Sequence, residues 1–80
     1  MALDVHEPIK VSAVFTNGRL KPVSFVWNRR HYRIVEITGV YRYSIGASKC
    51  YGYTVRSGTE LYEISLHTGE MVWHLERVHS

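Results

Sequence analysis

Residues 9–27 read IKVSAVFTNGRLKPVSFVW, and this stretch decides the fold. Valine, isoleucine and aromatic residues dominate both of its arms, as is typical of strands. Asn17-Gly18 stands between the arms, and this dipeptide favours the positive φ angles of a type I′ turn. We therefore expect a β-hairpin with strands over about residues 9–16 and 21–27. Alternation in the second arm predicts Val23, Phe25 and Trp27 on one face and Ser24 on the other.

The rest of the chain reads as further strands divided by turn signals. No segment has a convincing helical period. In the strand near the C-terminal third, alternation places Tyr62, Ile64 and Leu66 inward and Glu63 outward. We expect these further strands over about residues 31–43, 50–56, 60–66 and 71–78, with residues 44–49 as the most irregular loop.

Alternation slips in the long third strand. Tyr32 and Ile34 share one face, whereas Val35 and Ile37 share the other. Because the side-chain period of a strand is two, a straight half-buried strand cannot do this. Either both faces are buried there, or a bulge or bend moves the strand between packing layers, for which Gly39 offers a place.

The short turns fix the fold class. Parallel neighbours need crossovers of a dozen or more residues, so strands joined by two- to four-residue turns are largely antiparallel. The sequence predicts an all-β protein with about six antiparallel strands in a bent meander that closes into a small SH3-like barrel. Residues 1–8 are expected to form a flexible N-terminal tail, and residues 9–80 a single small β domain.

Composition narrows the classes of protein. The 80 residues are 45% hydrophobic and 12% aromatic, which is not a disordered composition. One cysteine, Cys50, excludes an intramolecular disulfide. The N-terminus has neither a basic leader nor an apolar run, and no stretch approaches the roughly 20 apolar residues that span a bilayer. We therefore expect a cytoplasmic protein without a membrane partner.

Two stretches carry a resemblance to a known family. The first, residues 21–37, reads KPVSFVWNRRHYRIVEI. The second comprises Leu61–Leu66, then Thr68-Gly69, and then residues 73–78, which read WHLERV. They resemble a family of short bacterial β domains of unknown function, in which a Pro-x-x-Phe-x-Trp strand precedes an Arg-x-Tyr-x-Val strand and the domain closes on Trp-x-Leu-Glu-Arg-Val. The resemblance covers roughly residues 21–78. It implies a fold more than an activity, and an association of some members with an error-prone, DNA-polymerase-like protein.

Positive charge is concentrated in the first half of the chain. Residues 1–42 hold seven Lys and Arg against three acids, while residues 43–80 hold three against four. Lys and Arg neutralise phosphates, and exposed rings stack on unpaired bases. The competing interpretation is a solvated basic edge with the tyrosines packed in the core. The candidate site for nucleic acid or an acidic partner, carried by two neighbouring turns that hairpin geometry could bring together, comprises Arg19, Lys21, Arg29, Arg30 and Arg33.

Other chemistry has little support. The five histidines lack the close pairing of zinc ligands. Nothing in the sequence assigns a base to Cys50, and a buried strand residue is the simpler role for it. No Gly-rich loop opens a helix to hold phosphate. We expect no enzyme activity, no metal or other cofactor and no small-molecule substrate.

These observations predict a non-catalytic accessory or binding module that uses a basic, aromatic-flanked face for nucleic acid or an acidic partner. The alternative is a protein–protein interaction or homodimerising domain that acts through an exposed strand edge or an aromatic patch. The sequence leaves the oligomeric state open.

Overall fold

The Asn17-Gly18 dipeptide forms the predicted two-residue turn in the computed structural model, which describes residues 2–79. Asn17 has φ 51° and Gly18 has φ 74°, the left-handed values that a type I′ turn requires. The turn joins β1 (Ala2–Thr16) to β2 (Arg19–Trp27), and the two strands pair antiparallel. The hairpin that the sequence predicts is therefore present.

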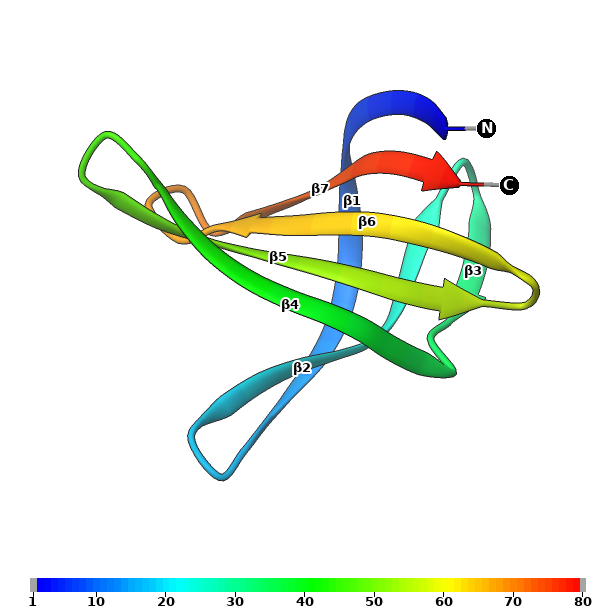
Figure 1. Cartoon of the computed structure of the whole chain (residues 1–80), viewed down its shortest axis with the longest axis horizontal. Helices are drawn as coiled ribbons and strands as arrows, with labels where there is room; N and C mark the ends of the chain where they lie inside the picture. Colours follow the sequence, from blue (N-terminus) through cyan, green and yellow to red (C-terminus); the bar gives the residue numbers. More distant parts are fainter. Residues whose placement is uncertain (1, 80) are drawn as a thin grey trace.

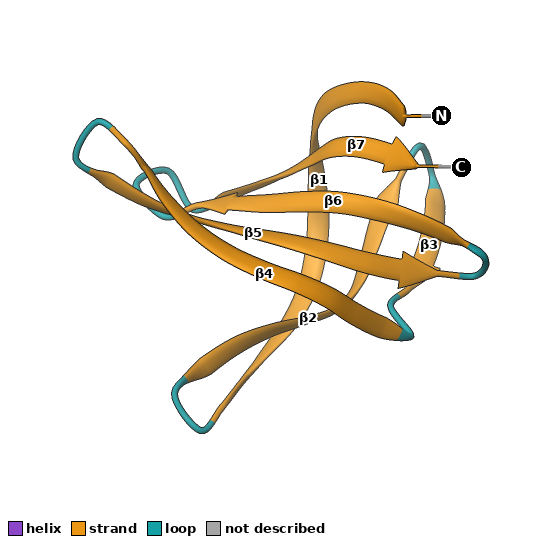
Figure 2. Cartoon of the chain, in the orientation of Figure 1, coloured by secondary structure: helices purple, strands orange, loops and turns teal. Residues whose placement is uncertain are grey.

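All described elements are strands, and they form one curled antiparallel sheet (Figure 1, Figure 2). Its order is β3-β2-β1-β7-β6-β5-β4. Residues 2–79 contain no helix long and apolar enough to cross a bilayer. The remaining strands are β3 (Arg30–Arg33), β4 (Glu36–Ile45), β5 (Ser48–Ser57), β6 (Glu60–His67) and β7 (Val72–His79).

The sheet has seven strands instead of about six, because the expected third strand divides into β3 and β4. Ile34 and Val35, between them, hold the two sides of the sheet together at one corner. The Ile34 N–H donates to the Val23 carbonyl on β2 (3.0 Å), and the Val35 N–H donates to the Arg56 carbonyl on β5 (2.9 Å). β3 and β4 end the sheet and do not pair with each other. The predicted closed barrel is therefore a half-barrel that closes only at this corner.

The break between β3 and β4 accounts for the slip in alternation, and two bulges further change which side chains face inward. The register of β4 on β5 shifts between Ile37 and Gly39, where the sequence offered a bend. On β2, Ser24 lies opposite Ser12 and Pro22 lies opposite Ala13, so Val23 is bulged and has no partner on β1. Phe25 and Trp27 point inward as predicted, but the bulge leaves Val23 exposed.

The N-terminal segment is the first correction to the domain boundaries. Residues 2–8 were expected to be a flexible tail, but they form the start of β1 and pair with β7. Asp4 binds Arg77 at 2.8 Å. The register shifts between Asp4 and Glu7, and His6 has φ 53°. This bulge hides the strand from a search for alternation.

Residues 44–49 are the second correction. They were expected to be an irregular loop, but they complete a tight hairpin in which Ile45 faces Ser48. Gly46 has φ 61°, and glycine in the first position is the signature of a type II′ turn. The β4–β5 hairpin is therefore continuous almost to its tip.

The hydrophobic core lies on the concave face of the sheet. Phe25 stacks on Tyr32 with ring centroids 4.9 Å apart and meets Tyr62 edge-on at 5.4 Å. Trp27 and Trp73 are only partly buried and pack against the margin of the core. The core residues are Phe25, Tyr53, Val55, Tyr62, Ile64, Leu75 and Val78.

Candidate binding cleft

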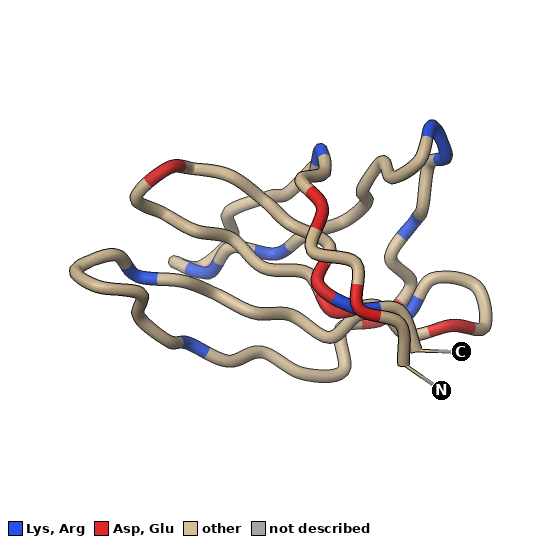
Figure 3. Tube along the Cα trace, turned by 90° about the horizontal axis from the view of Figure 1, so that it is seen from above, with Lys and Arg blue, Asp and Glu red and all other residues tan. Residues whose placement is uncertain are grey.

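The five basic residues predicted from sequence do not form one patch. Arg19 and Lys21 follow the β1–β2 turn, whereas Arg29 and Arg30 lie at the opposite end of β2. Eight steps along a strand cover about 26 Å. Lys and Arg accordingly occur at both ends of the molecule (Figure 3). The expectation that neighbouring turns bring them together is wrong, because consecutive hairpin turns lie at opposite ends of their shared strand.

A cleft of about 910 Å³ opens at the end that carries Arg19 and Lys21. It lies between the β1–β2 hairpin and the concave side of β4–β7. Both hairpin arms and the turn itself contribute to one wall. The residues that line the cleft are Phe15, Thr16, Asn17, Gly18, Arg19, Leu20, Lys21, Ile37, Val40, Arg42, Tyr51, Tyr53, Leu66, Met71 and Trp73.

The floor of the cleft is aromatic. Tyr53 and Trp73 have ring centroids 5.8 Å apart. The Tyr53 hydroxyl donates to the Leu20 carbonyl at 2.9 Å, which ties the floor to β2. Burial, reinforced by Tyr51, raises the pKa of Tyr53 above its ordinary value, so its hydroxyl keeps its proton at neutral pH. The floor is thus a fixed and uncharged surface.

The rim of the cleft exposes apolar side chains. Phe15 is 79% exposed and Met71 is 70% exposed. Met71 also has φ 54°, a left-handed conformation that is costly for a residue with a side chain. Water therefore contacts large apolar surfaces at the mouth of a cleft that no part of residues 2–79 covers.

Three cations surround this aromatic floor. The Arg42 guanidinium carbon lies 6.0 Å from the centroid of the Tyr51 ring. Within the described residues, neither Arg42, Arg19 nor Lys21 takes part in an ion pair. None of the described residues that line the cleft is acidic. The lining of the cleft therefore combines uncompensated positive charge with the tilted ring pair of Tyr53 and Trp73.

Arg42 is the functional candidate that the sequence analysis missed. In the expected continuous strand its side chain falls on no particular face. The bulge between Ile37 and Gly39 determines which face of β4 each later side chain occupies, and it places Val40 and Arg42 on the concave side. The sequence does contain a sign of this arrangement, because Arg42 stands two positions after the apolar Val40 and therefore shares its face.

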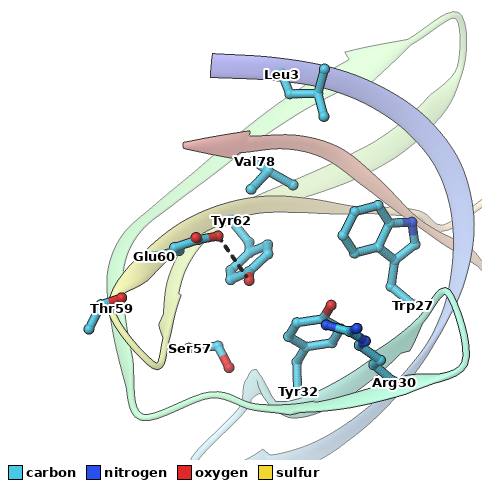
Figure 4. A pocket seen from close by; sticks show the side chains of 9 residues that line it. All are labelled: Leu3, Trp27, Arg30, Tyr32, Ser57, Thr59, Glu60, Tyr62 and Val78. Carbon is cyan, nitrogen blue, oxygen red and sulfur yellow. Dashed lines mark hydrogen bonds between the residues drawn. The ribbon is translucent and has the colours of Figure 1, made fainter. Parts of the chain in front are cut away.

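The other end of the half-barrel has a second, smaller pocket of about 510 Å³ (Figure 4). Trp27, Tyr32 and Tyr62 surround it, and Arg30 reaches its edge. Glu60 also lines this pocket and accepts a hydrogen bond from the Tyr62 hydroxyl at 3.4 Å. The charge of Arg30 is thus accompanied by a carboxylate in the same pocket.

The two remaining predicted residues line neither opening. Arg29 occupies the β2–β3 turn with φ 64°, and Arg33 is exposed at the end of β3 opposite Ser24. Neither takes part in an ion pair within residues 2–79. They are solvated cations that do not line the cleft.

Among the described residues that line the cleft there is no His, Cys, Asp or Glu. Residues 2–79 contain no group of three or more His, Cys, Asp or Glu side chains that could hold a metal ion. Cys50 is buried in β5. The cleft instead offers the exposed ring of Phe15, the partly exposed rings of Tyr51 and Trp73, and cationic groups for phosphate or carboxylate.

No protein-family model matches the chain, and comparison with curated proteins and with solved structures finds no similar protein either.

Proposed function

We propose that this protein is a non-catalytic accessory module that binds single-stranded nucleic acid in the cleft. The observation that carries the proposal is the combination of three unpaired cations, Arg19, Lys21 and Arg42, with an aromatic floor and no acidic lining residue. Phosphates would lie against the cations, and bases would stack on the rings.

The shape of the site favours a single strand. Stacking needs unpaired bases, and the exposed ring of Phe15 offers a face that paired bases could not use. The floor between Tyr51 and Trp73 is recessed behind the β1–β2 hairpin, so a flexible backbone reaches it more easily than a stiff duplex. We further propose that the half-barrel is a partly open relative of SH3-like barrels. We also propose that the protein works in the cytoplasm. The family resemblance suggests a role beside a polymerase-like protein.

Binding is tested with a labelled oligothymidine of about 12 nucleotides, a length within the site sizes of small β-barrel modules. Three neutralised phosphates predict a slope of about −2 for the logarithm of the association constant against that of salt. The affinity should therefore fall about 20-fold between roughly 50 and 200 mM salt. Fluorescence anisotropy measures this directly.

Two charge-matched triple variants locate the site. Arg19→Glu with Lys21→Glu and Arg42→Glu should lower the affinity at least about 100-fold, because three contacts become repulsive. Arg29→Glu with Arg30→Glu and Arg33→Glu alters the net charge equally and should change the affinity less than about threefold at moderate salt. Circular dichroism is the control that tests whether both variants fold.

Equal losses in the two triple variants would show that only net charge matters, and would reject the cleft as the site. An acidic protein partner is the competing occupant. Tighter binding of a polyglutamate peptide than of oligothymidine at the same salt would favour carboxylates over phosphates and reject the nucleic-acid proposal.

A further inference from the structure

The two edges of the sheet differ in how they are protected. β3 has only four residues, and Arg30, His31 and Arg33 occupy three of its positions. Short length and charge are the usual means by which an edge strand avoids pairing with another chain. β4 has ten residues, and Arg42 is its only charged side chain after Glu36. β4 is therefore an unguarded edge.

The free hydrogen-bonding groups of β4 follow from its register. Ile45 and Ser48 flank a two-residue turn, so they form a hydrogen-bonded pair, and alternate residues repeat that pattern. Tyr43 and Tyr41 thus direct their backbone groups toward β5. Val40, Arg42 and Ser44 direct theirs away from the sheet, on the side where β4 has no neighbour.

The convex face of this edge is apolar. Tyr41, Tyr43 and Ile45 are 43%, 38% and 57% exposed. The Tyr41 and Tyr43 rings stack at 6.2 Å. Tyr41 lies over Gly52 on β5, so closely that a Cβ atom there would come within 2.1 Å of its ring. These rings are therefore held in place before any partner arrives.

We propose that a second copy of this chain pairs antiparallel with β4, with Tyr43 directly opposite Tyr43 of the second copy. The partner is a second copy because the edge is self-complementary: Arg42 faces Ser44 and Ser44 faces Arg42, and each pair exchanges backbone hydrogen bonds. On the convex face Tyr41 meets Ile45 in both directions, so aromatic and aliphatic side chains pair across the interface.

Two other registers, centred on Arg42 and on Tyr41, are less favourable. Centring the pair on Arg42 places two guanidinium groups directly opposite each other, which is destabilising. Centring it on Tyr41 opposes Tyr43 to Gly39 and requires the bulged segment to join the ladder. The register centred on Tyr43 uses only the regular part of β4.

Such a pair has two-fold symmetry about an axis perpendicular to the sheet. The concave faces of both copies then lie on the same side, with the two Arg42 side chains near the junction. The inference does not rest on the ligand of the cleft, because it uses only the backbone edge and the convex side chains.

Two cysteine variants read the register. Residues facing each other in a non-hydrogen-bonded pair lie about 4.5 Å apart at Cα, within disulfide range. Under mild oxidation Tyr43→Cys should convert most of the chain to a covalent dimer. Tyr41→Cys, a neighbour on the same face, and the wild type with its buried Cys50 should stay uncrosslinked. Preferential crosslinking of Tyr41→Cys would overturn the register.

A proline variant tests the edge independently of oxidation. Ser44→Pro removes an outward N–H but leaves the ladder with β5 intact, whereas Ser44→Ala retains that N–H. By sedimentation equilibrium the dimer dissociation constant should rise about tenfold or more for Ser44→Pro, and stay near wild type for Ser44→Ala. A monomeric wild type at high concentration, or unchanged dimerisation of Ser44→Pro, would overturn the proposal.

Discussion

The two openings of the half-barrel contain the same kinds of residue but arrange them differently. In the cleft, three cations line the walls with no acidic residue in the lining, and Phe15 and Met71 expose apolar surface at the rim. In the pocket of Figure 4, Arg30 shares the site with Glu60, and the rings pack on one another. Tyr32 and Tyr62, for example, have centroids 5.4 Å apart.

This contrast separates a binding surface from the margin of a core. Rings that contact each other, as Tyr53 and Trp73 also do on the floor of the cleft, already have ring partners. The exposed Phe15 ring at the rim forms no aromatic pair within residues 2–79. Tyr62 illustrates the first case, since burial, helped by Glu60 and Tyr32, raises its pKa above the ordinary value. Composition alone gives both regions the same description, and only the contacts distinguish them.

The largest expected effect comes from the core beneath the pocket of Figure 4. Phe25 is 1% exposed and contacts both Tyr32 and Tyr62, so Phe25→Ala removes the centre of the aromatic cluster. We expect a loss of about 3–5 kcal/mol in the free energy of unfolding, the usual cost of deleting a buried ring. Urea denaturation measures it, provided that enough of the variant folds; a loss below about 1 kcal/mol would show that this end is not core.

The second largest effect is expected from a Phe→Ala substitution in the cleft. Phe15 is 79% exposed, so Phe15→Ala should change the free energy of unfolding by less than about 0.5 kcal/mol. If a base stacks on the ring, oligothymidine binding should weaken by about 1–3 kcal/mol. Anisotropy and urea denaturation on the same preparation give both numbers. Unchanged affinity would remove Phe15 from the binding surface.

The hairpin around Asn17-Gly18 could be predicted because its signals are local. A turn dipeptide and two β-rich arms specify the backbone without reference to the rest of the chain. The inward face of β6 follows from alternation in the same way, and Tyr62, Ile64 and Leu66 are buried as expected.

Three of the errors occur where a bulge breaks the period of two. One bulge leaves Val23 exposed, another fixes the face of Arg42, and a third hides the N-terminal strand around His6. A bulge depends on the neighbouring strand, which the local sequence does not reveal. The candidate site was half predicted for the same reason: Arg19 and Lys21 line the cleft, but the position of Arg42 depends on a register that forms only in the folded sheet.

A smaller effect tests the turn near the pocket of Figure 4. Arg29 has φ 64°, which is unfavourable for a side chain with Cβ. Arg29→Gly should raise the free energy of unfolding by about 0.5–1 kcal/mol, the strain relieved less the entropy that glycine adds to the unfolded chain. Asn28→Gly serves as control and should gain less, because asparagine tolerates this conformation. A destabilised Arg29→Gly would indicate that the side chain makes a contact worth more than the strain.

The smallest effect concerns Glu76, an acid that does not line the cleft and has hydrogen-bonding partners of its own. Burial opposes the ionisation of Glu76, but a hydrogen bond from Ser65 at 2.6 Å and contact with His6 at 2.6 Å together outweigh it, so its pKa lies below the ordinary value of 4.5. A carboxylate with a lowered folded-state pKa contributes stability that is fully present above the unfolded value and is lost as pH falls through the folded one. The thermal midpoint of Glu76→Gln should therefore lie below that of the wild type near neutral pH, and the gap should narrow as pH falls below 4.5.

Glu70→Gln is the control, because it removes an exposed carboxylate with no ion-pair partner within residues 2–79. Its thermal midpoint should show no such convergence with that of the wild type. A gap for Glu76→Gln that is constant across this range would mean that the substitution acts through packing and not through charge. In that case the ionised form of Glu76 would contribute nothing to the stability of the fold.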